Sequence, residues 1–112
     1  MYQPGDVLLV PFPFSSLETS KKRPVLALTA PDIFNDLVSL AITSSSYHEE
    51  SFPLDNECFS EGVLPKPSWV RVDKIYTLNL TLIIGKFGSL HQGVFNQVKK
   101  QFCDHFGCYQ YR

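Results

Sequence analysis

The sequence lacks three features that would point directly to a partner or a compartment: an excess of positive charge, a long apolar run and a cysteine pair. Its net charge is −1 at pH 7, so no overall basic field attracts nucleic acid. No apolar stretch approaches the roughly 18 residues that a membrane-spanning helix needs, and residues 1–4 do not resemble a secretory signal. The three cysteines include no CxxC pair, which favours free thiols. We therefore expect a soluble cytoplasmic protein that binds no membrane.

Catalytic and metal-binding motifs with a strict local pattern are also missing. The chain has no glycine-rich phosphate loop and no readable Ser-His-Asp order. The stretch His48–Glu50 is typical of a solvated loop. Cys103, His105 and Cys108 offer one compact half of a zinc site without a second half, which favours ordinary packing. We therefore expect no metal and no cofactor.

Apolar and aromatic residues are abundant. The 112 residues are 44% hydrophobic and include nine Phe and five Tyr. This content excludes a disordered tail and suits a β-rich globule. At this length we expect one domain, residues 1–112, with a single core.

Two apolar runs near the N-terminus organise the chain. Val7–Val10 and Val25–Leu28 are too continuous for strands with one wet face and too short for helices between prolines. The loop between them, Pro13–Lys22, is longer than a hairpin needs, and such loops are usually functional or disordered. Arg23 follows this loop where it enters the second strand, a suitable place to hold an anion.

The rest of the chain predicts further short strands and one helix. The predicted strands are Asp6–Phe12, Pro24–Ala30, Leu37–Thr43, Ser51–Leu54, Ser68–Ile75 and Leu82–Phe87, the last ended by Gly88. The polar segment Asp55–Lys66 is the least ordered by composition. In His91–Phe106 the apolar period changes to that of an amphipathic helix. The sequence thus predicts a mainly β protein of five to seven antiparallel strands, bent into a small or part-closed barrel, with a C-terminal helix.

Several polar residues at strand ends are candidates for chemistry, each with a structural alternative. Arg23 offers the fixed fork of donors that suits a phosphate, although a surface arginine beside a loop is common. Arg71 and Asp73 lie on one face of a strand, where they form either a catalytic pair or an ordinary salt bridge. Thr43 ends its strand and either binds substrate or satisfies backbone groups. Trp69 either stacks a base or packs in the core.

Four segments taken together resemble the PemK/MazF family of toxin–antitoxin ribonucleases. They are Gly5-Asp6, Arg23-Pro24, Ala41–Thr43 and Val70–Ile75, in the family's order and over nearly the whole chain. The resemblance implies the SH3-like barrel that this family shares with the gyrase poison CcdB, and a homodimer. It also implies a metal-independent endoribonuclease that cleaves single-stranded mRNA to 2′,3′-cyclic phosphate and 5′-hydroxyl ends, and a cognate antitoxin that blocks the RNA groove.

The resemblance also implies roles for the candidate residues. Asp73 would deprotonate the ribose hydroxyl, Arg71 would protonate the leaving oxygen, and Arg23 with Thr43 would bind the phosphorane. A carboxylate is a sounder base than an arginine, which favours Asp73. The residues expected to bind RNA are Glu18, Lys21, Lys22, Ser44, Ser45, Trp69 and Lys74. The histidine that some PemK-type proteins carry in the first loop is absent here.

Two other functions stay open at this stage. One is a CcdB-like poison that binds a protein target without catalysis, although such a binder has no need of Arg23 and the Arg71/Asp73 pair. The other is an inactive barrel that binds RNA or a partner without cleaving, which suits the slightly acidic net charge.

Overall fold

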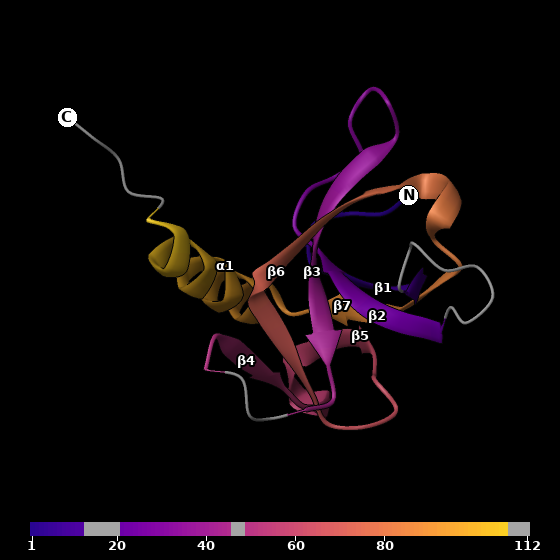
Figure 1. The fold of residues 1–112 in the computed structure, drawn as a ribbon. Helices are drawn as coiled ribbons and strands as arrows, with labels where there is room; N and C mark the ends of the chain where they lie inside the picture. The colour runs from indigo at the N-terminus through magenta and orange to yellow at the C-terminus, as the bar shows by residue number, and fades with distance from the viewer. Residues whose placement is uncertain (13–20, 46–48, 108–112) are drawn as a thin grey trace.

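The computed structural model describes residues 1–12, 21–45 and 49–107. Within these residues, seven antiparallel strands form one curled sheet in the order β4-β6-β3-β2-β1-β7-β5, and one helix, α1, follows them (Figure 1). The strands are β1 (Asp6–Phe12), β2 (Lys21–Ala27), β3 (Asp36–Thr43), β4 (Ser51–Leu54), β5 (Phe59–Gly62), β6 (Ser68–Asn79) and β7 (Gly85–Leu90); α1 spans Gln92–Phe106. The predicted mainly β barrel-like fold with a C-terminal helix is confirmed.

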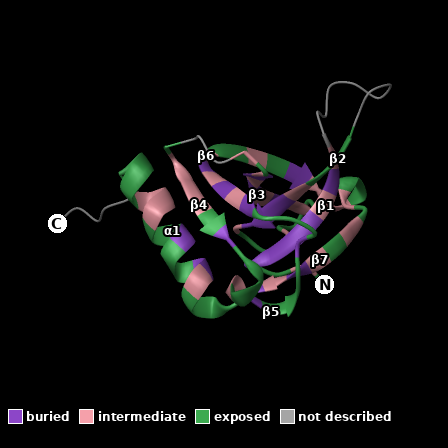
Figure 2. Ribbon diagram, turned by 90° about the horizontal axis from the view of Figure 1, so that it is seen from below, coloured by how far each residue is buried: buried purple, intermediate pink, exposed green. Residues whose placement is uncertain are grey.

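Strands β1 and β2 lie in the middle of the strand order and are buried on both faces (Figure 2). Val7 and Leu26 point into a cluster beneath α1, which we call the helix-side cluster. Leu8 and Val25 point into a second cluster on the opposite face, which we call the far-side cluster. Burial on both faces explains why these strands read as unbroken apolar runs.

Helix α1 closes the helix-side cluster. Phe95 and Val98 are buried in it, as the amphipathic period predicted. Phe106, placed in the same stripe by the sequence, is instead half exposed. The helix ends at Gly107, whose left-handed φ of 69° lets its amide donate to the Cys103 carbonyl.

Asp6 ties the start of β1 to β7. Its side chain is nearly buried, and its two oxygens accept hydrogen bonds from the Ser89 hydroxyl at 2.7 Å and the Gln3 amide at 2.9 Å. The Lys86 amine lies 3.7 Å away. The aspartate of the Gly5-Asp6 motif therefore has a structural role.

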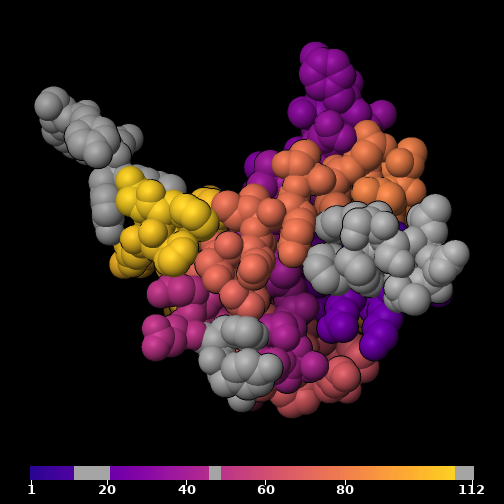
Figure 3. All heavy atoms as spheres, viewed as in Figure 1, coloured from indigo at the N-terminus to yellow at the C-terminus, as the bar shows by residue number. Residues whose placement is uncertain are grey.

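The connection between β2 and β3, residues 28–35, projects from the body of the molecule (Figure 3). The Asp32 carboxylate accepts hydrogen bonds from the amides of Phe34 and Asp36 at 2.8 and 3.0 Å, as expected of an Asx turn. Ile33 and Phe34 are exposed at its tip.

The element predictions were wrong in four places, at β2, β5, β6 and β7. Strand β2 begins and ends three residues before the predicted range, and the polar segment thought least ordered contains β5. Strand β7 begins at Gly85 and continues through Gly88, which was expected to end it. Gly88 pairs with Gly62 so closely that a Cβ on either glycine would lie 2.0 Å from a backbone oxygen of the other strand. Two glycines allow a backbone approach that a side chain would prevent.

Strand β6 is longer than predicted, because residues 76–79 also pair with β3, and it contains a bulge. Leu40 pairs with Ile75, but its neighbour Ala41 pairs with Arg71, so residues 72–74 are extra on the β6 side. Side chains five positions apart face opposite sides of a regular strand. The bulge breaks this alternation between Arg71 and Tyr76.

Candidate active site

The ends of β2 and β3 bring Arg23 and Thr43 together. The basic start of β2, Lys21–Arg23, is exposed, whereas Val25 is buried and anchors the strand. Val25 pairs with Ala41. Arg23 lies two residues before Val25 and Thr43 two residues after Ala41, so the antiparallel arrangement places them at the same end of the two strands.

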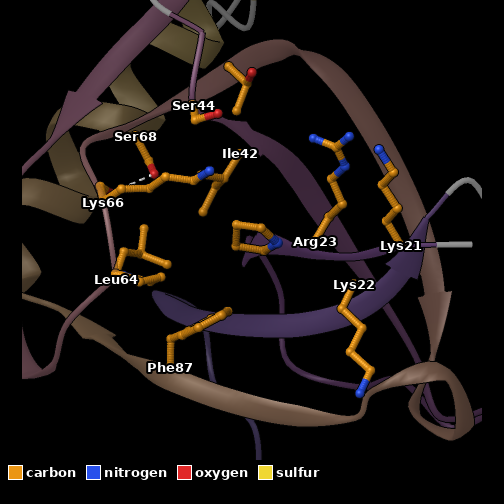
Figure 4. A pocket seen from close by; sticks show the side chains of 12 residues that line it. Lys21, Lys22, Arg23, Ile42, Ser44, Leu64, Lys66, Ser68 and Phe87 are labelled. Atoms are coloured by element: carbon orange, nitrogen blue, oxygen red, sulfur yellow. Dashed lines mark hydrogen bonds between the residues drawn. The ribbon is translucent and has the colours of Figure 1, made fainter.

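A cleft of about 350 Å³, which we call the basic cleft, opens beside these two residues (Figure 4). Its cations are Lys21, Lys22, Arg23 and Lys66. Its apolar lining is Pro24, Ile42, Leu64, Pro65 and Phe87, and Thr43, Ser44 and Ser68 add hydroxyls. In Figure 4, Lys21 and Arg23 point to the same side, Lys22 turns away from them, and Lys66 extends from the opposite wall. The cleft combines positive charge at its rim with an apolar floor.

A second cleft of about 270 Å³, which we call the tyrosine cleft, adjoins the first. Arg71, Lys74 and Tyr76 of β6 line it, together with Val25 and Ala41. Four residues line both clefts: Arg23, Pro24, Ile42 and Thr43. Arg23 and Thr43 therefore lie on a ridge between two hollows.

Arg71 and Asp73 form a two-point ion pair. Arg71 Nε donates to Asp73 Oδ1 at 2.8 Å, and Nη2 donates to Oδ2 at 2.7 Å. The two side chains are only 17% and 26% exposed, so water screens the pair incompletely. The hydrogen bonds to Arg71 lower the pKa of Asp73, and those to Asp73 raise the pKa of Arg71.

The Thr43 hydroxyl is held by the backbone that follows it. Its Oγ1 accepts a hydrogen bond from the Ser45 amide at 3.1 Å, which leaves its own proton free to donate. The Ser45 hydroxyl is buried without a hydrogen-bond partner among the described residues. Ser44 lies between them and lines the basic cleft.

The structure thus gathers most of the predicted site residues. Arg23, Thr43 and Arg71 line one cleft, and Asp73 is bonded to Arg71. Lys21, Lys22 and Ser44 line the basic cleft, and Lys74 lines the tyrosine cleft. Trp69 is half-buried and pairs with Thr43 and Pro53, outside the lining of both clefts. Glu18 lies outside the described residues.

Three cleft residues escaped the sequence analysis. Lys66 lies between two prolines in the segment thought least ordered, and Phe87 was assigned only to a strand. Tyr76 lies beyond the bulge that interrupts the period of β6. Among these three residues, only Lys66 had a local signal in the sequence, its position between Pro65 and Pro67.

Of the residues considered for metal binding, Glu50, Cys103 and His105 are described, and none of the three lines either cleft. His105 on α1 instead faces Glu50, with its Nδ1 3.3 Å from Oε2. His48 and Cys108 lie outside the described residues. Across residues 1–12, 21–45 and 49–107, no three His, Cys, Asp or Glu side chains gather as a metal site. None of the described helices is long and apolar enough to cross a membrane.

The fold and the cleft define a class: a small curled β-sheet protein with a C-terminal helix and a basic cleft at the ends of its central strands. Residues 3–106 match the family of PemK-like, MazF-like toxins of type II toxin–antitoxin systems. The chain belongs to this family. The PemK/MazF resemblance is therefore confirmed. A search of the curated proteins gives no match to the chain.

Solved structures share the fold at low sequence identity. An endoribonuclease in complex with its cognate antitoxin, from a mycobacterial species, is 14% identical with a TM-score of 0.70, covering 99% of this chain and 100% of that one. The Mycobacterium tuberculosis toxin MazF-mt6 is 21% identical with a TM-score of 0.68, covering 91% and 96%. A MazE–MazF crystal structure from Deinococcus radiodurans is 17% identical with a TM-score of 0.74, covering 96% of this chain and 97% of that one.

Proposed function

We propose that this protein is an endoribonuclease toxin that cleaves single-stranded RNA without a metal ion. Its family consists of toxins, and proteins of the same fold include endoribonucleases. The observation that carries the proposal is the grouping of Arg23, Thr43 and Arg71 around one cleft, with Asp73 bonded to Arg71. These groups supply what cleavage by an internal 2′-hydroxyl requires: a proton acceptor and donors for the phosphate.

The substrate brings its own nucleophile. The 2′-oxygen forms a bond to phosphorus while the bond from phosphorus to the 5′-oxygen breaks, which leaves a 2′,3′-cyclic phosphate and a 5′-hydroxyl. The Asp73 carboxylate takes the proton of the attacking hydroxyl. A guanidinium keeps its proton at neutral pH with or without an ion pair, so Arg71 stabilises charge and solvent water protonates the leaving oxygen. This assignment replaces the proton-donor role that the resemblance implies for Arg71.

The ion pair restrains Asp73 until substrate binds. Both carboxylate oxygens accept from Arg71, which makes Asp73 a weak base in the free protein. A phosphate beside Arg71 competes for the same donors, because guanidinium binds phosphate as readily as carboxylate. Binding of RNA therefore loosens the pair and strengthens Asp73 as a base at the time that a base is needed.

Arg23 and Thr43 act on the phosphate itself. Arg23 is exposed at the ridge, where its guanidinium can donate to two non-bridging oxygens. The Thr43 hydroxyl, oriented by the Ser45 amide, donates to the charge that develops on the phosphorane.

A cognate antitoxin is the partner we propose, since relatives of the same fold are found in complex with antitoxins. A chain that covers the basic cleft would block RNA. The homodimer implied by the resemblance and a cytoplasmic location stay predictions.

Incubation of the purified chain with end-labelled single-stranded RNA in EDTA tests this function. We expect cleavage with 5′-hydroxyl ends, and a loss of at least about 100-fold in rate for Arg23→Ala, because the phosphorane loses its main donor. Lys99→Ala, which removes an exposed charge on α1, is the control and keeps the rate.

Two results would overturn the proposal. RNA that binds without being cleaved would make the protein a non-catalytic barrel. Growth arrest in cells, without any RNA cleavage in vitro, would instead indicate a poison of a protein target. Full cleavage by Arg23→Ala would refute the role of that residue alone.

A further inference from the structure

The two clefts continue the two apolar clusters of the fold, on opposite faces of the sheet. In the basic cleft, Leu64 belongs to the helix-side cluster and Phe87 packs against it. In the tyrosine cleft, Val25 belongs to the far-side cluster and Tyr76 packs against it. The ridge of Arg23 and Thr43 separates them. A phosphodiester bound at this ridge has one nucleotide on each side.

We propose that each cleft is the subsite of one nucleotide next to the scissile phosphate, and that the strand runs in one direction across the ridge. The nucleotide on the 5′ side of the phosphate occupies the tyrosine cleft, and the nucleotide on its 3′ side occupies the basic cleft. This inference rests on the endoribonuclease function proposed above.

The position of the proton acceptor sets the direction. The attacking 2′-hydroxyl belongs to the nucleotide on the 5′ side, and its acceptor must lie within hydrogen-bond reach. Arg71 lines the tyrosine cleft, and Asp73 is bonded to it. The ribose of the 5′ nucleotide therefore lies on that side, and its base stacks on Tyr76, which lines the same cleft.

The basic cleft suits the nucleotide that leaves. Phe87 packs against the helix-side cluster and also lines the cleft, beside Pro24 and Leu64. An aromatic ring on an apolar floor is a stacking platform for a base whose neighbours are unstacked. Lys66 extends over this floor from the opposite wall (Figure 4), where its amine meets the next phosphate or a base oxygen.

The wall that carries Lys66 is held in place. The buried Ser68 hydroxyl donates to the Lys66 carbonyl at 3.0 Å, and Pro65 and Pro67 restrict the backbone on both sides. The basic cleft therefore exists before RNA binds, which lowers the cost of ordering on binding.

Mapping the cleaved ends of a long RNA gives the first test. Phe87→Leu should relax the base preference on the 3′ side of the cut, and Tyr76→Leu that on the 5′ side. Each variant should lower RNA affinity by roughly 5- to 100-fold, because each loses one stacked base. Phe34→Leu, at the exposed tip of the β2–β3 connection, is the matched control and changes neither.

Photo-crosslinking of the wild-type protein gives a second reading that needs no substitution. The probe is a short RNA with the mapped site and a 2′-deoxynucleotide before the scissile phosphate. The label is 4-thiouridine on the 3′ side of this phosphate or, in a second probe, 4-thio-2′-deoxyuridine on its 5′ side. The thiouridine on the 3′ side should crosslink to Phe87 or Lys66, and the one on the 5′ side to Tyr76.

The outcomes separate this inference from the function that it extends. If the wild-type protein does not cleave RNA, no scissile phosphate is bound at the ridge, and both proposals are wrong. Three results obtained together with cleavage would overturn the assignment of the subsites: reversed crosslinks, no crosslink in either cleft, or an altered preference on the same side in both variants. In each case the proposed ribonuclease activity would still stand.

Discussion

At the scale of single residues, the environment of Asp73 holds its pKa below the ordinary value of a carboxyl group. Both of its oxygens accept hydrogen bonds from Arg71, which lowers the pKa of the carboxyl. Histidine, which titrates near neutral pH, is absent from the described lining of either cleft. The proposed chemistry therefore depends on the Asp73 carboxylate, which is already charged. It becomes a stronger base when the RNA phosphate competes with it for Arg71.

The ion pair predicts a pH dependence of stability. Because the pKa of Asp73 is lower in the folded protein than in the unfolded chain, its charge stabilises the fold above the unfolded value of about 3.9. This contribution is lost as the pH falls through the still lower folded value. Asp73→Asn should therefore show a shallower fall in the free energy of unfolding between about pH 5 and pH 2 than the wild type, measured by urea unfolding. Parallel curves would show that the pair does not stabilise the fold.

At the scale of elements, local patterns predicted the strands with clear neighbours in sequence and failed where pairing is decided at long range. Strands β1 and β3, the edge strand β4 and α1 lie at or within a residue of their predicted bounds. Strand β5 is short and mostly exposed, and it is defined by its pairing with β7, where Gly62 meets Gly88. In a sequence, a glycine inside a strand suggests that the strand ends there, unless the residue that pairs with it on the neighbouring strand is known.

In the candidate site, too, the sequence predicted the residues with local signals and missed those placed by long-range pairing. Arg23, Thr43 and the Arg71/Asp73 pair stand at readable strand positions, and the sequence pointed to all of them. Tyr76 and Lys66 could not be found, because a bulge and a loop bring them to the clefts.

The glycine pair predicts a loss of stability on adding one methyl group. In Gly88→Ala the new Cβ would lie 2.0 Å from the Glu61 carbonyl oxygen, so β5 and β7 must separate. We expect the free energy of unfolding to fall by about 1–3 kcal/mol, measured by urea unfolding. Gly85→Ala in the same strand is the control, because nothing lies within 4 Å of its added Cβ. Equal stability of the two variants would contradict this account of β7.

At the scale of the whole molecule, a net charge of −1 coexists with a cluster of positive charge at the clefts. Six cations line the two clefts: Lys21, Lys22, Arg23, Lys66, Lys74 and Arg71. The charge of Arg71 is balanced by Asp73, so the lining contributes five further positive charges. The overall charge therefore does not steer RNA over long distances, and the local cations supply the contacts.

This arrangement predicts a modest dependence of RNA affinity on salt. Each phosphate neutralised on a single strand contributes about −0.7 to the slope of log K against log salt, so five cations limit the slope to about −3.5. Lys66→Ala should reduce its magnitude by about 0.7, whereas Lys99→Ala on α1 should leave it unchanged. Titrations of labelled RNA at several salt concentrations measure both. A slope near zero would mean that RNA does not bind at these clefts.

The bulge in β6 makes one cleft depend on the length of a strand as well as on the identity of its residues. Arg71 and Tyr76 meet at the tyrosine cleft because three extra residues separate the two registers of that strand. Loss or gain of a single residue there moves each later side chain of the strand to the opposite face of the sheet. An insertion or deletion at Lys74, after Asp73, is thus a route by which a lineage could trade one nucleotide preference for another while Arg71 and Asp73 stay as they are.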